Sequence, residues 1–224
     1  MNQEQWTAVD HYISETVVPS DAALDAAIEA SSKAELPAIA VTPNQGKLLQ
    51  IFARLVHARR VLEIGTLGGY STIWLARALP EGGRVISLEL NPKHAEVARA
   101  NIERAGLSKR VEIRLGRAQD TLPKLAAEAK DPFDLIFIDA DKASIPQYFT
   151  WSLKLSRPGS VIIVDNVVRK GAVIDAASSD EDVQGVRRLN DMLATEKRVT
   201  ATTIQTVGSK GYDGFTLALV NAVA

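Results

Sequence analysis

The chain contains no cysteine, which excludes disulfide bridges, thiolate nucleophiles and thiolate-bound metals. It also has no large excess of either charge, because 26 basic and 27 acidic residues give a net charge of −1. A nucleic-acid-binding surface needs a basic excess, so we expect no such partner. No apolar run approaches the roughly 18 residues of a membrane span, and residues 1–6 lack the features of a secretory signal. We therefore expect a cytoplasmic protein without a membrane partner.

Histidine chemistry is also poorly supported. The only histidines are His11, His57 and His94, and each falls in a different expected helix. This separation argues against a histidine-based metal or nucleophile site and favours packing or surface roles. The G-x-S-x-G pattern of a serine nucleophile is absent.

The length of 224 residues and the 46% of hydrophobic residues suit a single domain with a full core. We expect a helical segment over residues 1–58 and a sheet core over 59–224, without a linker between them. In the first segment, Asp21 can cap a helix over 22–33. Pro43 suits the first turn of a further helix that runs to about residue 58.

From residue 60 onward, strand and helix patterns alternate. Strands are expected at 60–64, 84–90, 111–115, 133–139 and 160–164, with Pro158-Gly159 as a turn before the last. Helices are expected between them at 71–78, 92–105, 121–130 and 144–155. Such repetition predicts a doubly wound α/β fold, a parallel sheet with helices on both faces. After a helix at 183–196, strands at 199–207 and 212–220 are joined by so short a loop that they must form an antiparallel hairpin.

Acidic and amide side chains follow two of the expected parallel strands. Asp139 ends the run 133–139, while Asp165 and Asn166 follow the run 160–164. Ligands of open α/β sheets bind in the crevice at the carboxyl ends of the strands. If the two strands are neighbours, these side chains offer carboxylate and amide oxygens to one point. Such oxygen ligands suit Mg²⁺, Mn²⁺ or Ca²⁺.

A glycine-rich turn links the first expected strand to the next helix. Its sequence, Glu63 to Ser71, contains Gly65 at the strand end, where a ligand can approach the backbone closely. The spacing differs from the G-x-G-x-x-G of nicotinamide enzymes and from phosphate-binding loops. After the second strand, Glu89 is either an acceptor for ribose hydroxyls or a surface acid that begins the next helix. After the third strand, Gln119-Asp120 marks either a place for an adenine ring or a helix cap.

Taken together, these motifs identify a family. Residues from about 41 to 220 resemble the cation-dependent, S-adenosylmethionine-dependent O-methyltransferases, the group of catechol and caffeoyl-CoA O-methyltransferases and their bacterial relatives. The resemblance is carried by E-I-G-x-x-G-G-Y-S from Glu63, F-I-D-A-D-K from Phe137 and V-D-N from Val164. It implies the methyltransferase version of the Rossmann-like sheet, five parallel strands plus a C-terminal hairpin. It is weaker over 1–40 and 168–182, where members vary and where we expect acceptor selectivity.

The resemblance also assigns roles to residues of this chain. It implies that the S-adenosylmethionine pocket is lined by Val41, Glu63, Gly65, Thr66, Ser71, Glu89, Ala118 and Asp139. It implies that Asp139, Asp165 and Asn166 hold a divalent cation, with Mg²⁺ first and Mn²⁺ or Ca²⁺ as alternatives. It implies that Lys142 is the catalytic base beside Asp139, and that the protein is a homodimer.

The implied chemistry is an in-line displacement at the methyl carbon by an acceptor oxygen. Fixing that geometry can supply roughly 7–11 kcal/mol of the barrier. A divalent cation that binds two vicinal oxygens would make a phenol easier to ionise, which favours a small aromatic diol as acceptor.

Several alternatives remain open from the sequence. Without the resemblance, a solvated lysine at the start of the next helix is the favoured interpretation of Lys142, because most lysines are exposed. Asp141 is either a supporting acid of the site or a cap of that helix. Tyr148 or Trp151 could wall the acceptor pocket, although core packing is the simpler role. Other nucleophiles, larger natural products, or non-catalytic S-adenosylmethionine binding are the competing functions.

Overall fold

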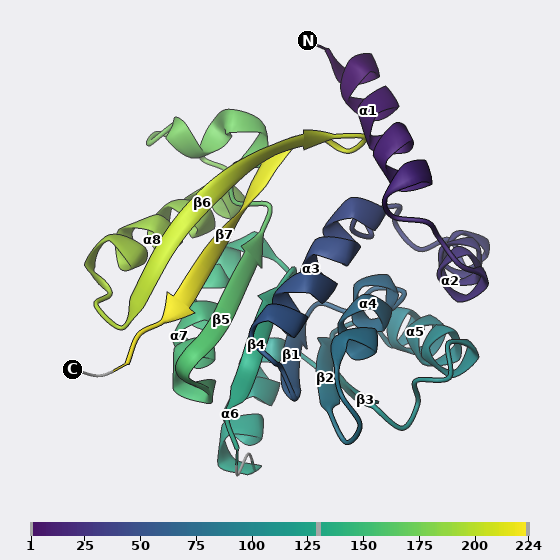
Figure 1. Cartoon of the computed structure of the whole chain (residues 1–224). Helices are drawn as coiled ribbons and strands as arrows, with labels where there is room; N and C mark the ends of the chain where they lie inside the picture. Colours follow the sequence, from purple (N-terminus) through teal and green to yellow (C-terminus); the bar gives the residue numbers. More distant parts are fainter. Residues whose placement is uncertain (1, 129–130, 223–224) are drawn as a thin grey trace.

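The structure is a computed structural model that describes residues 2–128 and 131–222. A seven-stranded sheet with strand order β3-β2-β1-β4-β5-β7-β6 forms its centre (Figure 1). The first five strands are β1 (Arg60–Ile64), β2 (Arg84–Glu89), β3 (Val111–Leu115), β4 (Phe133–Ile138) and β5 (Ser156–Asp165). They pair in parallel. Strands β6 (Val199–Gly208) and β7 (Gly211–Val220) form the hairpin, and β7 pairs antiparallel with β5. The predicted fold class is confirmed.

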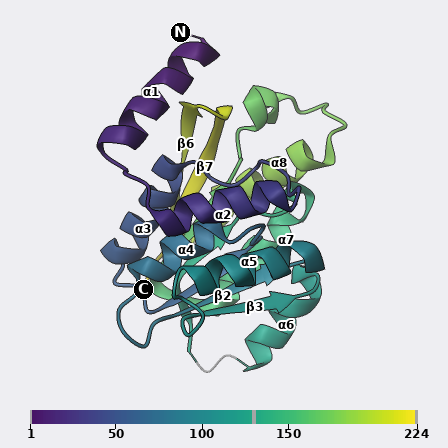
Figure 2. The same ribbon diagram turned by 90° about the vertical axis from the view of Figure 1, so that its right-hand side faces the viewer.

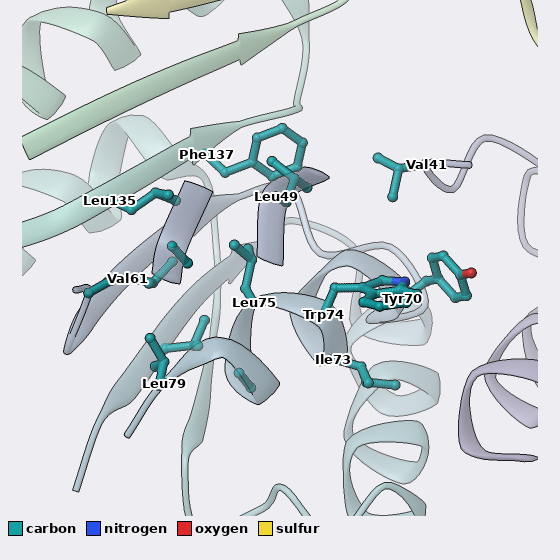
Figure 3. Close-up of a cluster of buried hydrophobic side chains, with 14 of the residues drawn as sticks. Val41, Leu49, Val61, Tyr70, Ile73, Trp74, Leu75, Leu79, Leu135 and Phe137 are labelled. Atoms are coloured by element: carbon teal, nitrogen blue, oxygen red, sulfur yellow. The ribbon is translucent and has the colours of Figure 1, made fainter. Parts of the chain in front are cut away.

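Helices cover both faces of the sheet, as Figure 1 shows. One face carries α3 (Pro43–Leu55), α4 (Tyr70–Ala78) and α5 (Pro92–Arg104), and the other carries α6 (Ala118–Glu128), α7 (Ile145–Leu155) and α8 (Glu181–Thr195). Because side chains of a strand alternate between faces, β1 sends Val61 to the first layer and Leu62 to the second. Figure 3 shows the first layer, in which Leu75 and Phe137 are completely buried.

The N-terminal helices lie outside this sandwich. Helix α2 (Ala22–Lys33), capped by Asp21 as predicted, packs on α4 and α5 (Figure 2). Helix α1 (Gln3–Thr16) projects beyond the sheet and has no buried residue. It contacts the tip of the hairpin, where Gln3 Nε2 donates to Gly208 O (2.9 Å) and Ser209 N donates to Asp10 Oδ2 (2.7 Å).

Some predicted boundaries were wrong. Helix α3 ends at Leu55 rather than residue 58, because His57 takes a left-handed φ of +50°. Strand β5 begins at Ser156, so the expected turn at Pro158-Gly159 lies within it, where the pairing with β4 is irregular and Gly159 has φ +87°. Helix α6 begins at Ala118 rather than 121, and the predicted end of that helix at 129–130 lies outside the described residues.

Among the described residues, no helix combines the length and the apolar character that crossing a bilayer requires.

Candidate active site

A cavity of about 720 Å³ opens at the carboxyl ends of β1, β2 and β4. Of the residues expected to contact the cofactor, all but Glu63 line this cavity: Val41, Gly65, Thr66, Ser71, Glu89, Ala118 and Asp139. Lys142 and Asn166 line it as well. An adjoining cavity of about 260 Å³ is lined by Asp165 and shares Asn166. The structure thus brings the predicted cofactor, metal and base residues to one edge of the sheet.

The glycine turn fits closely against the end of β4. Gly65 has φ +100°, and a Cβ atom there would stand 2.0 Å from the carbonyl oxygen of Asp139. Any larger residue would push the two strand ends apart. Gly69, with φ +81°, is the N-cap of α4, and Tyr70 and Ser71 in the first turn of that helix line the cavity.

Glu89 is buried rather than a surface acid, so the second interpretation of that residue was wrong. Its Oε2 accepts hydrogen bonds from Thr66 N (3.1 Å) and Leu67 N (2.8 Å), and its Oε1 accepts from Asn91 N (2.8 Å). His94 Nδ1 lies 3.5 Å from Oε1, and His94 also lines the cavity, a position that the expected surface or packing role did not specify. Glu89 therefore holds the glycine turn in shape.

Glu63 lies beneath the cavity and does not line it. Its carboxylate is completely buried and accepts hydrogen bonds from Ser71 Oγ (2.6 Å), Ser87 Oγ (2.6 Å) and Thr72 Oγ1. Burial raises the pKa of Glu63 to about 7, against the lowering effect of these hydroxyl groups. Glu63 is connected to the cavity only indirectly, because Ser71, which lines the cavity, donates a hydrogen bond to its carboxylate.

The two strand-end acids lie side by side on neighbouring strands, since Ile138 pairs with Val164 and each acid is the next residue. Asp165 is buried and accepts a hydrogen bond from Gln45 Nε2 (2.6 Å). Burial, and next the charge of Asp139, raise the pKa of Asp165 to about 7. A divalent cation would relieve this repulsion, so the donor chemistry fits one.

Histidine, cysteine and carboxylate side chains form no group of three or more suited to metal binding in residues 2–128 and 131–222. The predicted ligand set has only two carboxylates, and its third donor is the amide of Asn166. That residue has φ +57°, and its backbone N–H donates to Asp165 Oδ1 (2.9 Å). This contact fixes the backbone of Asn166 against Asp165, and Asn166 lines both cavities.

Lys142 is buried, so the solvated alternative was wrong. Its Nζ lies 2.8 Å from Asp139 Oδ1. Lys142 begins a short 3₁₀ turn, η1 (Lys142–Ser144), which follows the three residues after β4.

The comparisons with known proteins identify the family of the chain. The O-methyltransferase family model matches residues 14–220. The chain belongs to the O-methyltransferase family. It is 54% identical to a catechol O-methyltransferase of Niastella koreensis, over 98% of this chain and 100% of that one, and 55% identical to a catechol O-methyltransferase of Mycobacterium tuberculosis, over 95% and 94%. The predicted family membership is confirmed.

Solved structures of O-methyltransferases share the fold closely. The Bacillus cereus O-methyltransferase in complex with SAH superposes with a TM-score of 0.97 at 57% identity, covering 98% of this chain and 100% of that one. TomG of Streptomyces achromogenes, an O-methyltransferase involved in tomaymycin synthesis, in complex with SAM, gives 0.96 at 55% identity, covering 99% and 100%. These similarities favour an enzyme over the non-catalytic alternative.

Tyr148 and Trp151, the two aromatic residues considered for the wall of the acceptor pocket, lie in different surroundings on α7 of this O-methyltransferase. Tyr148 lines the cavity, and its hydroxyl donates to Asp141 Oδ1 (2.5 Å). Burial, together with the Asp141 carboxylate, raises the pKa of Tyr148. Trp151 packs against the α6–α8 layer instead, with Lys154 Nζ 4.4 Å from its ring centroid. Asp141 supports Tyr148, and its side chain does not cap the next helix.

Several residues of the O-methyltransferase site lack a recognisable signal in the sequence. Gln45 orients Asp165, and Asp182 accepts a hydrogen bond from Ala143 N (3.2 Å). Lys210, at the hairpin tip, donates to the carbonyl oxygens of Ala38 and Ala40, beside Val41. Among these elements, α8 carries one signal that the sequence could have supplied. Gly185 lies within its helical pattern, and a glycine in that position often marks close packing.

Proposed function

We propose that this O-methyltransferase transfers a methyl group from S-adenosylmethionine to a hydroxyl of a small vicinal dihydroxy aromatic acceptor, with the help of a divalent cation. The observation that carries the proposal is the pair of neighbouring strand-end carboxylates, Asp139 and Asp165, beside the buried Lys142. The catechol O-methyltransferase names of two relatives support the acceptor class.

The cofactor would occupy the large cavity over the glycine turn. SAH and SAM in two closely similar structures support this choice. The start of α4, with Ser71 in its first turn, favours the negatively charged carboxylate of the cofactor. Glu89 still has acceptor capacity beyond its three backbone bonds, which suits the ribose hydroxyls.

The cation would be held by Asp139, Asp165 and Asn166, with Mg²⁺ the best match to these oxygen donors and Mn²⁺ or Ca²⁺ as alternatives. When bound, a divalent cation makes an acceptor hydroxyl easier to ionise and orients it. Asp165 Oδ2 accepts from Gln45 Nε2 and Oδ1 accepts from the Asn166 backbone N–H, so these two contacts orient the carboxylate.

The proton of the acceptor hydroxyl would pass to the Nζ of Lys142 once that amine is neutral. The contact of 2.8 Å with Asp139 Oδ1 supports this role, because an acceptor oxygen on a cation held by Asp139 would lie close to the amine. General-base help of this kind contributes about 10²–10⁴-fold to a rate.

The test measures methyl transfer to a panel of catechols before and after EDTA treatment. We expect EDTA to abolish transfer and Mg²⁺ to restore it. The Asp165→Asn variant should need far more Mg²⁺ and should lose the Mg²⁺-induced rise in Tm. The matched control is Asp191→Asn, on the exposed side of α8. Transfer that resists EDTA would remove the cation from the mechanism.

We also propose a homodimer in which α1 contributes to the contact. Helix α1 has no buried residue, and its Val9 and Tyr12 are 51% and 66% exposed. A monomer mass by light scattering at micromolar protein would contradict this assignment.

A further inference from the structure

The segment that follows β5 contributes to the wall of the large cavity. There Arg169 lines the cavity together with Asn166, Lys142 and Asp182. The guanidinium donates through Nη2 to Asp182 Oδ2 (3.2 Å), while its Nε is buried and has no hydrogen-bond partner within the described part of the chain. Because a guanidinium carries five N–H donors, most of its donor capacity is unused.

The backbone around Arg169 is fixed in an unusual conformation. Arg169 and Lys170 have left-handed φ values of +56° and +55°. Such conformations are strained for residues other than glycine and persist where the surroundings enforce them, often at ligand sites. Here Asp213 Oδ1 accepts from Val168 N (2.9 Å) and Arg169 N (3.0 Å), which fixes the backbone at the start of this segment. The chain therefore holds this arginine in place at the cavity wall.

The carboxylates nearby already have partners. Asp139 pairs with Lys142, and Asp141 accepts from Tyr148. Asp182 is shared between Arg169 Nη2 and Ala143 N, the residue after Lys142. The Asp182 carboxylate thus links Arg169 to the turn that carries the proposed base.

We propose that Arg169 binds a carboxylate carried by the acceptor, so that vicinal dihydroxy aromatic acids are preferred over neutral or cationic diols. The planar guanidinium suits this ligand, because it can pair with both oxygens of a carboxylate. This inference rests on the proposed function, since it specifies the acceptor class of the same site.

The test compares 3,4-dihydroxybenzoate with 3,4-dihydroxybenzamide, which has the same shape without the charge. Electronic differences between the two rings are the same for every variant, so they cancel when kcat/KM ratios are compared. Arg169→Met should lower the acid-to-amide ratio of kcat/KM at least tenfold, mainly through KM for the acid. Arg169→Lys should retain part of the preference, because it keeps a charge but loses the fork geometry.

The matched control is Arg187→Met. Arg187 Nη1 donates to Val173 O (2.6 Å) and so holds the same segment without lining the cavity. It should leave the ratio within twofold of wild type. An unchanged ratio in Arg169→Met, or an equal loss for acid and amide, would overturn the proposal and leave Arg169 as a tether for Asp182.

Calorimetry with SAH-loaded protein separates this inference from the proposed function. We expect the acid to bind wild type at least tenfold more tightly than Arg169→Met. Failure of wild type to methylate either compound would contradict the proposed function, while binding of the acid that depends on Arg169 would still support the subsite. Equal binding to both proteins would refute the subsite.

Discussion

The carbonyl oxygen of Lys142 lies 2.1 Å from the position that a Cβ atom on Gly185 would occupy. Helix α8 therefore packs against the backbone of the turn that carries the proposed base. Two further contacts join them, Ala143 N to Asp182 Oδ1 (3.2 Å) and Arg188 Nη2 to Ala143 O (3.2 Å). A helix distant in the sequence thus fixes the position of Lys142.

Replacing Gly185 with Ala should separate these two backbones. In an exposed helix the change would stabilise by up to about 1 kcal/mol, but here the added methyl group must displace Lys142. We expect a lower Tm and a fall in kcat of at least tenfold, measured by thermal unfolding and by transfer to a catechol. Asn190→Ala, on the exposed side of the same helix, is the control. Unchanged kcat in Gly185→Ala would show that the turn tolerates the shift.

Lys210 ties the hairpin tip to the segment that walls the cofactor cavity. Its Nζ donates to Ala38 O and Ala40 O, and Ile39 and Val41 of that segment line the cavity. Burial lowers the pKa of Lys210, while the charges of Asp139 and Asp165 act in the opposite direction. Lys210→Ala should weaken SAH binding about three- to tenfold and speed amide exchange over residues 38–41, with Lys197→Ala as the control. Unaltered exchange there would show that the tie is dispensable.

Glu89→Gln should weaken SAH binding at least tenfold by calorimetry. Each hydrogen bond to a carboxylate is worth roughly 1.5–3 kcal/mol, and the carboxylate both shapes the turn through Thr66 N and Leu67 N and faces the cavity. Glu96→Gln, on the exposed side of α5, should bind as wild type does. An unchanged dissociation constant would move the ribose site elsewhere.

The sequence predicted the parts of this site that local patterns encode. Buried strands end where their apolar runs end, so the apolar pattern placed Asp139, Asp165 and Asn166 at the ends of two strands. That these strands are neighbours was a condition of the prediction, and the strand order of the sheet meets it. The glycine turn was predictable because a strand, a turn and a helix follow one another directly. The membership of the family rested on these same short motifs.

Long-range contacts were not predictable in this way. Gln45, Gly185 and Lys210 act on the site from elements more than 40 residues away in the chain, and no spacing rule links them to Asp165 or Lys142. Glu63 was expected to line the cofactor pocket, but its carboxylate is buried beneath hydroxyl groups that include that of Ser71 and does not line the cavity. Burial of that kind depends on how helix α4 packs, which one strand's pattern does not reveal.

Glu63 should make stability depend on pH. Its pKa is about 7 in the folded protein against 4.5 for the ordinary group, because burial disfavours the charged form. Above pH 4.5 the unfolded state releases this proton first, so the free energy of unfolding should fall as pH rises toward 7. At 1.36 kcal/mol per pKa unit the loss is about 3 kcal/mol. Urea unfolding at pH 5 and pH 7.5 should show a smaller fall in Glu63→Gln. Parallel pH profiles for the two proteins would contradict this assignment.

Lys142→Ala tests the proposed base. Turnover of an ordinary catechol should fall roughly 10²–10⁴-fold, while SAH affinity, measured by calorimetry, stays close to that of wild type. Lys124→Ala, on the exposed side of α6, controls for loss of a lysine charge. Raising the pH should partly restore the Lys142→Ala variant, because the acceptor hydroxyl then ionises without a base.

The acidity of the acceptor gives the sharper discrimination. A nitrocatechol already ionises near neutral pH, so it should lose least on removal of Lys142 if that residue takes the hydroxyl proton. An equal loss for acidic and ordinary catechols, expressed in KM rather than kcat, would instead make Lys142 a binding residue. Its contact with Asp139 Oδ1 at 2.8 Å would then serve to orient the carboxylate, and the proton would have to leave to solvent.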